Sequence, residues 1–347
     1  MKVLIYVGYQ QQPFNHLTLR ETGLGGTELS CIFLGKELSQ LGLDVTIGGE
    51  VIDGKWDKLT FESFDTMRSK LTRYDVCIAA SYIHYLLELQ DYVQWGRSYL
   101  WMHNTEFYTW WNGMEIPNAS QLLRSPMLNG IVCLTKWHKN DFLSKYGLQR
   151  PMHVIGNGIV KETFIESDKP KKRNSFIYTS APDRGLELAL KIWPKIKAER
   201  PDATFKIYCP SYALGWMGKY DTQQPGVIVK NNINQLDLHT SMQESEYWLY
   251  PTDYEETFCI TALEMKYAKV IPIVNRIAAL GETVKNGITV SHEGSEEEII
   301  DRYVKSILNM NEQTKQDIVD RNYEWVKSSS WYVQALKWRD LIFNNNV

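Results

Sequence analysis

Short apolar runs alternate with helical segments along most of the chain, and this alternation limits the folds open to it. Short runs that are mainly apolar are typical of strands buried in parallel sheets. They occur at residues 2–7, 44–47, 75–80, 97–102, 131–134, 176–179, 204–208, 227–230, 247–250 and 270–274. The pattern predicts an α/β protein with doubly wound parallel sheets. A chain of 347 residues is long enough for two such domains, each with its own core.

The net charge argues against one class of function, and the cysteines indicate a cellular compartment. A net charge of -3 and a pI near 6.2 argue against a nucleic-acid binder, which normally has a strong basic excess. The five cysteines are scattered without metal-ligand spacing, which indicates reduced thiols and a cytoplasmic location. The opening MKVLIYVGY is too short and too polar for a signal peptide, and no run of about 18 apolar residues is present to span a membrane.

One helical segment, 136–146, has basic and aromatic residues on its surface. Trp137 lies among Lys136, Lys139 and Lys145. A solvated surface helix is the more ordinary interpretation, and peripheral contact with an anionic membrane is the alternative.

The residues between the last two apolar runs predict a helix that carries an inward-facing carboxylate. Ile260, Leu263 and Tyr267 have the spacing of an apolar stripe, and Glu264 falls on the same stripe. An unpartnered buried charge is costly. We therefore expect Glu264 to have hydroxyl or cationic partners, supplied by the protein or by a ligand.

A second carboxylate, Glu256, lies in the loop before this helix. The first-turn amides of Phe258, Cys259 and Ile260 have no partner within a helix, so they form a site suited to phosphate or another anion. In the purely structural alternative, Glu256 complements the helix dipole, which contributes about 0.3 to 1 kcal/mol, and Glu264 is paired within the protein.

A glycine-rich turn precedes the first long helix. Gly23, Gly25 and Gly26 allow a ligand to approach the backbone closely at a helix N-terminus. A nicotinamide-dinucleotide fingerprint, with Glu50 as its ribose carboxylate, is the obvious competitor. Its spacing fails, because the third glycine of that fingerprint would fall on Glu28. A helix-start turn without a ligand is the plain alternative.

His103 comes just after the run 97–102, at the carboxyl end of a predicted strand, where α/β sheets bind ligands. The aromatic residues that follow lie in a loop-like stretch, which argues against all of them being core residues. We expect them to form an acceptor surface by ring stacking, with a lid or an oligomer contact as alternatives. The acceptor candidates of this stretch are Asn104, Tyr108, Trp110 and Trp111, and Phe107 belongs to the same aromatic cluster.

The two carboxylates have a spacing that is found in a known family. Glu256 and Glu264 form the pattern E-x7-E, and a strand and the segment AALGETVKNG follow. This arrangement resembles the donor site of the retaining glycosyltransferases of family 4. The resemblance implies the GT-B fold, in which two Rossmann-like βαβ domains with parallel sheets face a central cleft. It also implies that Glu256 lies beside the transferred sugar and that Glu264 binds the ribose hydroxyls of a nucleotide sugar.

The resemblance extends to other positions. Gly25 and Gly26 match the family's Gly-Gly loop, and His103 matches a histidine that family members carry near the donor sugar and the acceptor. Arg184 matches the basic residue of a Lys-Gly pair that grips the diphosphate. Ala181 stands at the place of the arginine in a Gly-Arg pair, so one expected phosphate-binding residue is missing.

The resemblance also divides the chain. Residues 1–158 form an acceptor-side Rossmann-like domain, and the polar, charged segment 159–173 is the expected linker. Residues 174–329 form the donor domain. Residues 330–347 form a helix that crosses back to the first domain.

The implied reaction is transfer of a sugar from a nucleotide diphosphate sugar to an acceptor hydroxyl, with retention at the anomeric carbon. The acceptor is a glycan, a glycolipid or the glycan of a glycoprotein. His103 and Glu256 are the implied catalytic residues. The implied donor-binding residues are Gly25, Gly26, Arg184, Thr257, Phe258, Cys259, Ile260 and Glu264.

No cofactor and no metal are expected. The D-x-E triplet at 253–255 looks like the metal site of the other large glycosyltransferase class, and a charged turn explains it better. Three alternatives stay open: a nucleotide-sugar epimerase or hydrolase of the same fold, a non-catalytic nucleotide-sugar-binding protein, and, with least support, a nicotinamide oxidoreductase.

Overall fold

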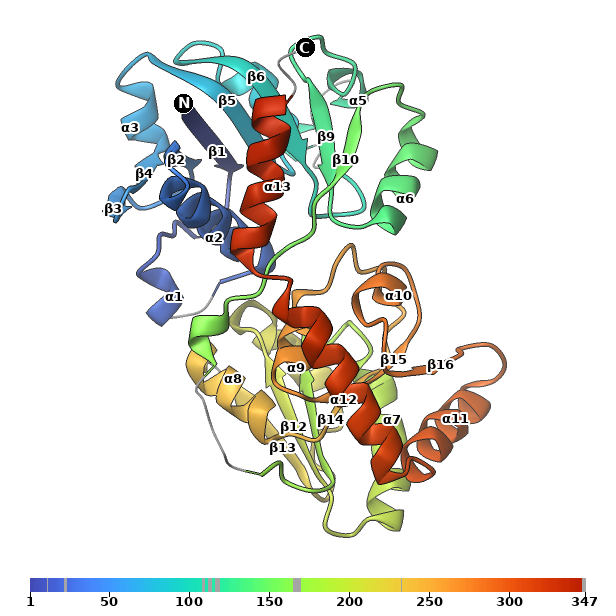
Figure 1. The fold of residues 1–347 in the computed structure, drawn as a ribbon. Coiled ribbons are helices and arrows are strands. Elements are labelled where there is room, and N and C mark those ends of the chain that lie inside the picture. Colours follow the sequence, from blue (N-terminus) through green and yellow to red (C-terminus); the bar gives the residue numbers. More distant parts are fainter. Residues whose placement is uncertain are drawn as a thin grey trace. The chain divides into compact units, whose positions relative to one another are not determined.

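The computed structural model describes residues 1–10, 12–21, 24–107, 110–111, 114–115, 119–164, 170–231 and 233–344. The chain divides into two compact units, Met1–Gly158 with Trp331–Val347, and Ile159–Ser330. Each unit has a mainly parallel sheet layered with helices (Figure 1). The α/β class and the parallel sheets predicted from the sequence are confirmed.

The first unit is built on an eight-stranded sheet within the described residues, in the order β10-β9-β6-β5-β1-β2-β4-β3. Its neighbouring strands are parallel except β3 and β4, which are antiparallel. The elements are β1 (Lys2–Gly8), α1 (Thr18–Glu21), α2 (Gly26–Gln40), β2 (Asp44–Gly49), β3 (Gly54–Trp56), β4 (Leu59–Ser63), α3 (Phe64–Arg68), β5 (Thr72–Ala80), α4 (Tyr85–Glu88), β6 (Val93–Trp101), β7 (Trp110–Trp111), β8 (Met114–Glu115), α5 (Ala119–Leu122), β9 (Gly130–Cys133), α6 (Lys136–Tyr146), β10 (Met152–Val154) and α13 (Trp331–Asn344). The strand order reverses between β1 and β5, so the loops after these strands open at a switch point.

The C-terminal helix α13 completes the first unit by packing against α2 (Figure 1). Its Trp338 is fully buried, and the Trp338 ring lies 5.4 Å from the Trp101 ring of β6, edge to face. A buried tryptophan contributes a large apolar area, which fixes the end of the chain to a unit whose other residues precede position 159.

The second unit has a six-stranded sheet within the described residues, in the order β13-β12-β11-β14-β15-β16, and all its neighbours are parallel. Its elements are η1 (Lys161–Thr163), β11 (Ser175–Thr179), α7 (Leu186–Glu199), β12 (Thr204–Cys209), η2 (Ser211–Lys219), β13 (Val227–Asn231), α8 (Gln235–Glu244), β14 (Tyr247–Tyr250), α9 (Ile260–Tyr267), β15 (Ile271–Asn275), α10 (Leu280–Thr283), β16 (Ile288–Val290), α11 (Glu296–Leu308) and α12 (Glu312–Lys327). The order reverses between β11 and β14, and this is the second switch point.

Part of the segment expected as a linker is anchored in the second unit. Lys171 donates to the carbonyls of Gln243, Ser245 and Ala268 at 3.1, 2.7 and 2.8 Å. Ile159 pairs with Ser330 in an isolated bridge. Residues 165–169 of the expected linker lie outside the described residues.

The structure differs from the sequence-based expectation in several short elements. Strands β3, β4 and β16 were not predicted, and neither was the 3₁₀ helix η2. Among the described residues, no helix is both long enough and apolar enough to cross a membrane.

Candidate functional site

The loop after β14 turns the chain sharply into α9. Its last residue, Cys259, is the N-cap of α9 with φ of 66° and ψ of 82°. This left-handed region costs a non-glycine residue about 1 to 2 kcal/mol. Within the described chain, the backbone amides of Phe258, Cys259 and Ile260 donate no hydrogen bond. The loop therefore offers three backbone donors at the start of a helix, which suits an anion.

Glu256 lies in the same loop, 7% exposed, with two side-chain partners. The Tyr250 hydroxyl donates to Oε1 of Glu256 at 2.6 Å, and Nη1 of Arg184 contacts the same oxygen at 3.2 Å. Burial, followed by the charge of Glu256, raises the pKa of Tyr250 well above its usual value. The phenol therefore keeps its proton and remains a donor to the carboxylate.

Arg184 reaches Glu256 from the neighbouring strand of the switch point, in the loop after β11. Its guanidinium lies 4.1 Å from the centre of the Tyr254 ring. Gly185 has φ of 92°, and a Cβ at this position would clash with the Pro251 carbonyl. Only glycine lets the two loops come this close. The switch point of the second sheet thus brings a cation and a carboxylate together from two crossover loops.

Ala181 stands where the family has a basic residue, and its turn is held by a tyrosine that bonds to the backbone. Ala181 is 4% exposed. The Tyr178 hydroxyl shares its single proton between the carbonyls of Ala181 and Arg184, at 2.7 and 3.1 Å. A tyrosine therefore shapes the turn between β11 and α7, and the turn presents Arg184 as its cation.

Glu264 lies on α9 and is 9% exposed. Gln235 Nε2 donates to its Oε1 at 3.0 Å, and His239 Nε2 lies 3.2 Å from the same oxygen. The sequence predicted hydroxyl or cationic partners for this carboxylate, whereas its partners in the structure are a side-chain amide and an imidazole. The partners themselves, Gln235 and His239 of α8, were not predicted, although their spacing of four residues places both on one helix face.

The inward stripe predicted for α9 is wrong in part. The buried residues of this helix are Ala262, Leu263, Glu264, Met265 and Lys266, whereas Ile260 and Tyr267 are half-buried. The physical reason is that α8, α10, α12 and β15 all contact α9. Lys266 donates to the Thr283 carbonyl and lies 3.8 Å from the centre of the Trp325 ring. Burial lowers the pKa of Lys266 to about 7.

In the first unit, His103 follows β6 and is 8% exposed. Its amide donates to Ser81 Oγ at 3.1 Å, and its ring centre lies 4.3 Å from that of Trp101. Burial, with a smaller effect from His138, lowers the pKa of His103 to about 3. The ring is therefore neutral at neutral pH, which suits contact with an uncharged ligand group.

His138 of α6 holds the residue that follows. The Leu134 amide donates to His138 Nδ1 at 3.3 Å, so Nε2 carries the proton and donates to the Asn104 carbonyl at 2.9 Å. Burial lowers the pKa of His138 to about 4. The backbone next to His103 is thus fixed by a neutral histidine of defined tautomer.

The structure describes only some of the other acceptor candidates. Tyr108 lies outside the described residues, and Trp110 and Trp111 form β7, which pairs with β8. Phe107, which belongs to the same aromatic stretch, is a core residue. It is 5% exposed, and its ring centre lies 5.0 Å from that of Tyr146. The stretch is therefore core in part, and an acceptor role for Asn104, Tyr108, Trp110 and Trp111 stays a prediction.

The glycine turn lies at the start of α2. Gly25 is the N-cap residue, the helix begins at Gly26, and both glycines are exposed. Burial raises the pKa of Glu28 in the first helical turn. Gly23 lies outside the described residues.

The D-x-E triplet has a structural role. Asp253 Oδ1 lies 2.7 Å from His292 Nδ1 and accepts from Asn275 Nδ2 at 3.1 Å. In the ranges that the structure describes, no three His, Cys, Asp or Glu side chains are arranged to hold a metal ion. Metal independence stays a prediction.

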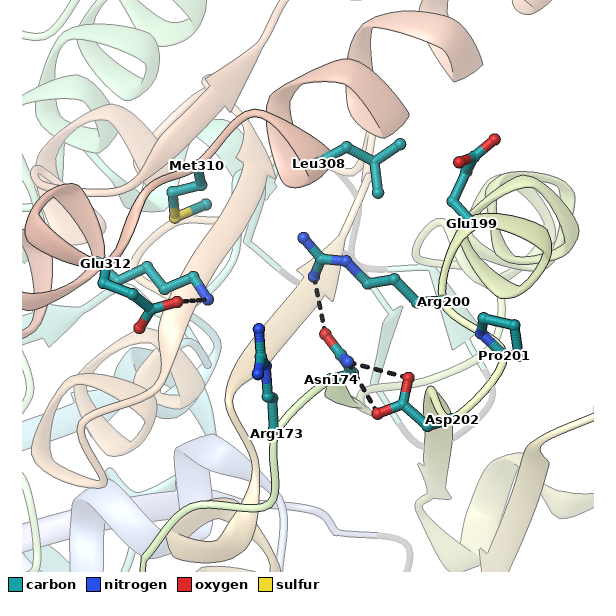
Figure 2. Close-up of a pocket in the computed structure, with 10 residues that line it drawn as sticks. Arg173, Asn174, Glu199, Arg200, Pro201, Asp202, Leu308, Met310 and Glu312 are labelled. Carbon is teal, nitrogen blue, oxygen red and sulfur yellow. Dashed lines mark hydrogen bonds and ion pairs between the residues drawn. The ribbon is translucent and has the colours of Figure 1, made fainter.

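A pocket of about 490 Å³ lies at the opposite edge of the second sheet, beside the amino ends of β11 and β12 (Figure 2). Arg200 donates to the Asn174 side chain at 3.1 Å, and Asn174 donates to Asp202 at 2.9 Å. The charged lining residues are Arg173, Glu199, Arg200, Asp202, Glu312 and Lys315. Their charges balance, and none of the candidate residues lines this pocket, so the carboxyl edge is the better site.

Known structures define the class of the fold. Sucrose-phosphate synthase from Thermosynechococcus elongatus is 12% identical over 98% of both chains, with a TM-score of 0.72. An Escherichia coli structure described as trehalose-6-phosphate bound with UDP-2-fluoro glucose is 12% identical over 99% of both, with a TM-score of 0.70. WaaG, a glycosyltransferase involved in lipopolysaccharide biosynthesis, is 11% identical over 99% of this chain and 100% of its own, with a TM-score of 0.66. Likeness at these identities establishes the fold, and the predicted GT-B class is confirmed.

The family comparison concerns the second unit. Residues 160–325 match the model of the family described as glycosyl transferases group 1. The matched segment contains Arg184, Glu256 and Glu264. No curated protein matches the chain. The family match and the GT-B fold together support a glycosyltransferase.

Proposed function

We propose that the protein transfers a sugar from a nucleotide diphosphate sugar to an acceptor hydroxyl, with retention at the anomeric carbon, as in family 4. The observation that carries the proposal is the Arg184–Glu256 pair at the switch point of the second sheet, beside the amides that open α9. An arginine and helix-start amides suit a diphosphate, and a carboxylate such as Glu264 suits ribose hydroxyls.

The proposed reaction breaks the bond between the anomeric carbon and a diphosphate oxygen, and it forms a bond from that carbon to the acceptor oxygen. The leaving diphosphate takes the electron pair and accepts the proton of the acceptor hydroxyl, and Arg184 and the loop amides stabilise its charge. A guanidinium has five N–H donors in a planar fork, so one arginine can serve a carboxylate and a phosphate together. Glu256 supports the positive charge that develops on the sugar.

His103 has a different proposed role because it is neutral. An uncharged imidazole accepts or donates a hydrogen bond at a sugar or acceptor hydroxyl without competing for the diphosphate. The UDP-2-fluoro glucose in one of the similar structures supports a nucleotide sugar as the donor class. No metal is assigned a step.

The donor proposal is tested by thermal shift with UDP-, GDP-, ADP- and dTDP-sugars and with NAD. A ligand at about 100 times its dissociation constant adds roughly 2.7 kcal/mol of stability. One nucleotide-sugar class should stabilise the wild type. Glu264→Ala should bind it roughly ten- to a hundredfold more weakly, because a hydrogen bond to a charged group is lost. Glu255→Ala, at an exposed neighbour of Glu256, is the matched control.

Stabilisation by NAD alone would overturn the proposal in favour of an oxidoreductase. Product analysis with the stabilising donor then separates the remaining functions. A new glycoside with the donor's anomeric configuration supports retaining transfer, whereas free sugar indicates a hydrolase. Binding without turnover across an acceptor panel indicates the non-catalytic protein that the missing basic residue favours.

A further inference from the structure

A continuous set of polar contacts runs from Glu264 back to the first residues of the second unit. His239 of α8 is 1% exposed and lies between Glu264 and Thr163 of η1. Its Nε2 lies 3.2 Å from Glu264 Oε1, and its Nδ1 lies 2.8 Å from Thr163 Oγ1. The Phe164 ring stacks on the imidazole with centres 4.0 Å apart and planes inclined by 9°. The histidine is therefore held on both nitrogens and on one face.

The Thr163 hydroxyl determines which imidazole nitrogen is protonated. It donates its single proton to the Val160 carbonyl at 3.0 Å. Its oxygen must then accept from His239 Nδ1, so Nδ1 carries a proton. A histidine with a proton on Nδ1 is either the neutral tautomer with a bare Nε2 or the cation.

Both forms of His239 constrain Glu264 Oε1. In the neutral form, the Gln235 amide donates one N–H to His239 Nε2 at 2.9 Å and the other to Glu264 Oε1 at 3.0 Å. In the cation, Nε2 itself donates to that oxygen. His239 therefore holds Oε1 directly as the cation, and as the neutral tautomer it holds the Gln235 amide that donates to Oε1.

The second carboxylate oxygen of Glu264 is left for another partner. Within the described chain, Oε2 of Glu264 accepts no hydrogen bond, and this atom is accessible to solvent. A carboxylate that is held through one oxygen presents the other in a defined direction, which lowers the entropy lost on binding a hydroxyl.

We propose that His239 is a positioning residue for the nucleoside part of the donor: it holds Oε1 of Glu264 so that Oε2 meets a hydroxyl of the ribose. The inference rests on the proposed function, because it requires that Glu264 bind a nucleotide. The ligand class is a ribonucleoside diphosphate. A nucleotide without ribose hydroxyls gains nothing from this network.

The test compares a nucleoside diphosphate with its 2′,3′-dideoxy analogue by calorimetric titration of the full chain. UDP, GDP and ADP are titrated first, and the tightest binder and its dideoxy analogue are then used. His239→Phe keeps the ring that stacks on Phe164 and removes both hydrogen bonds. His239→Gln keeps a terminal amide within reach of Glu264. Thr240→Ala, at the next and exposed residue of α8, is the control.

We expect His239→Phe to weaken the ribonucleotide about tenfold, since the charged acceptor loses its orientation, and to leave the dideoxy analogue within about twofold. His239→Gln should recover most of the lost affinity, and Thr240→Ala should match the wild type. Thr163→Val should produce the same selective loss, only smaller.

Two results would overturn the positioning role. One is an equal loss for both nucleotides in His239→Phe, which would mark a general structural defect. The other is unchanged ribonucleotide affinity in that variant while Glu264→Ala loses it. Absence of binding by UDP, GDP and ADP to the wild type would overturn the ribonucleoside assignment, and if the dTDP-sugar of the thermal-shift panel also failed to bind, it would overturn the proposed function itself. Thermal melting of each variant shows that it is folded.

Discussion

The carboxyl edges of the two sheets share a topology and differ in charge. At the second edge, Arg184 pairs with Glu256 and Glu264 has polar partners from α8. In the first unit, burial lowers the pKa values of His84, His103 and His138 to about 4, 3 and 4. Glu88, a buried carboxylate of that unit, accepts hydrogen bonds from two tyrosine hydroxyls and pairs with Arg68.

This difference shows how one fold divides two binding tasks. An edge with a cation and helix-start amides stabilises a diphosphate, whose charge must be offset. An edge of neutral imidazoles suits uncharged hydroxyls, because it provides hydrogen bonds without a strong field. In the proposed function, the donor therefore binds the second unit, and an uncharged acceptor hydroxyl binds the first unit.

The largest expected effect comes from removing the charge of Glu256. Glu256→Gln keeps an acceptor for the Tyr250 hydroxyl and loses the negative charge beside the reacting sugar. We expect turnover to fall about a hundred- to a thousandfold with little change in donor affinity, as when one preorganised electrostatic group is removed. Steady-state kinetics measures kcat and KM separately. Glu255→Gln is the control, and an equal loss there would contradict the assignment.

Exchange of one cation in each unit tests the charge comparison directly. Arg184→Gln should weaken nucleoside diphosphate binding about ten- to a hundredfold, because charge-assisted hydrogen bonds to phosphate are lost. Arg68→Gln removes a cation that pairs with a buried carboxylate of the first unit, 3.4 Å away. Calorimetric titration should show wild-type affinity for Arg68→Gln. Similar losses in both variants would remove the proposed difference between the edges.

The sequence predicted the buried central strands and also the edge strand β13, and it missed short strands such as β3, β4 and β16. After the exposed Lys2, β1 is apolar and buried, and β14 is buried throughout, as is typical of strands inside a parallel sheet that is covered on both faces. Strand β4 reads LTFES and is only partly buried, and three-residue strands such as β3 carry little pattern. Periodicity cannot separate such segments from loops.

The candidate site shows a similar division. Glu256 and Glu264 were predicted because their spacing lies within one loop and helix of the chain. His239 and Gln235 were missed because their contact with Glu264 depends on how α8 packs against α9, which no local pattern encodes. Lys266 was missed for the same reason, since its burial is caused by α12 and the turn at Thr283.

Acidification should destabilise the first unit. Each buried histidine binds its proton more weakly in the folded state than in the unfolded state. The unfolded chain therefore takes up more protons as the pH falls below about 6.5, and stability falls with it. The slope is at most about 1.4 kcal/mol per pH unit for each histidine, or tenfold in the unfolding equilibrium.

The measurement is denaturant unfolding between about pH 6.5 and 5, above the range in which ordinary carboxylates titrate. Hydrogen exchange at each pH assigns the loss to one unit. His103→Gln should reduce the number of protons that the first unit takes up on unfolding by up to one, and its free energy of unfolding should then depend less on pH. A slope unchanged in that variant would mean that His103 is not neutral in the folded protein.

The smallest expected effect compares two strained residues, one at each edge. Ser81 and Cys259 have φ of 63° and 66°. Glycine at either position relieves about 1 to 2 kcal/mol of left-handed strain and adds unfolded-state entropy that offsets about 0.4 to 1 kcal/mol. Cys259 makes no side-chain cap bond, whereas Ser81 Oγ accepts from the His103 amide at 3.1 Å. Cys259→Gly should therefore raise the free energy of unfolding by about 0.5 to 1 kcal/mol. Ser81→Gly also loses one hydrogen bond, so its free energy of unfolding should lie about 1 kcal/mol below that of Cys259→Gly. Equal changes in the free energy of unfolding would show that the serine hydroxyl does not hold the backbone of His103, and the neutral edge would then lack the preorganisation that its proposed role requires.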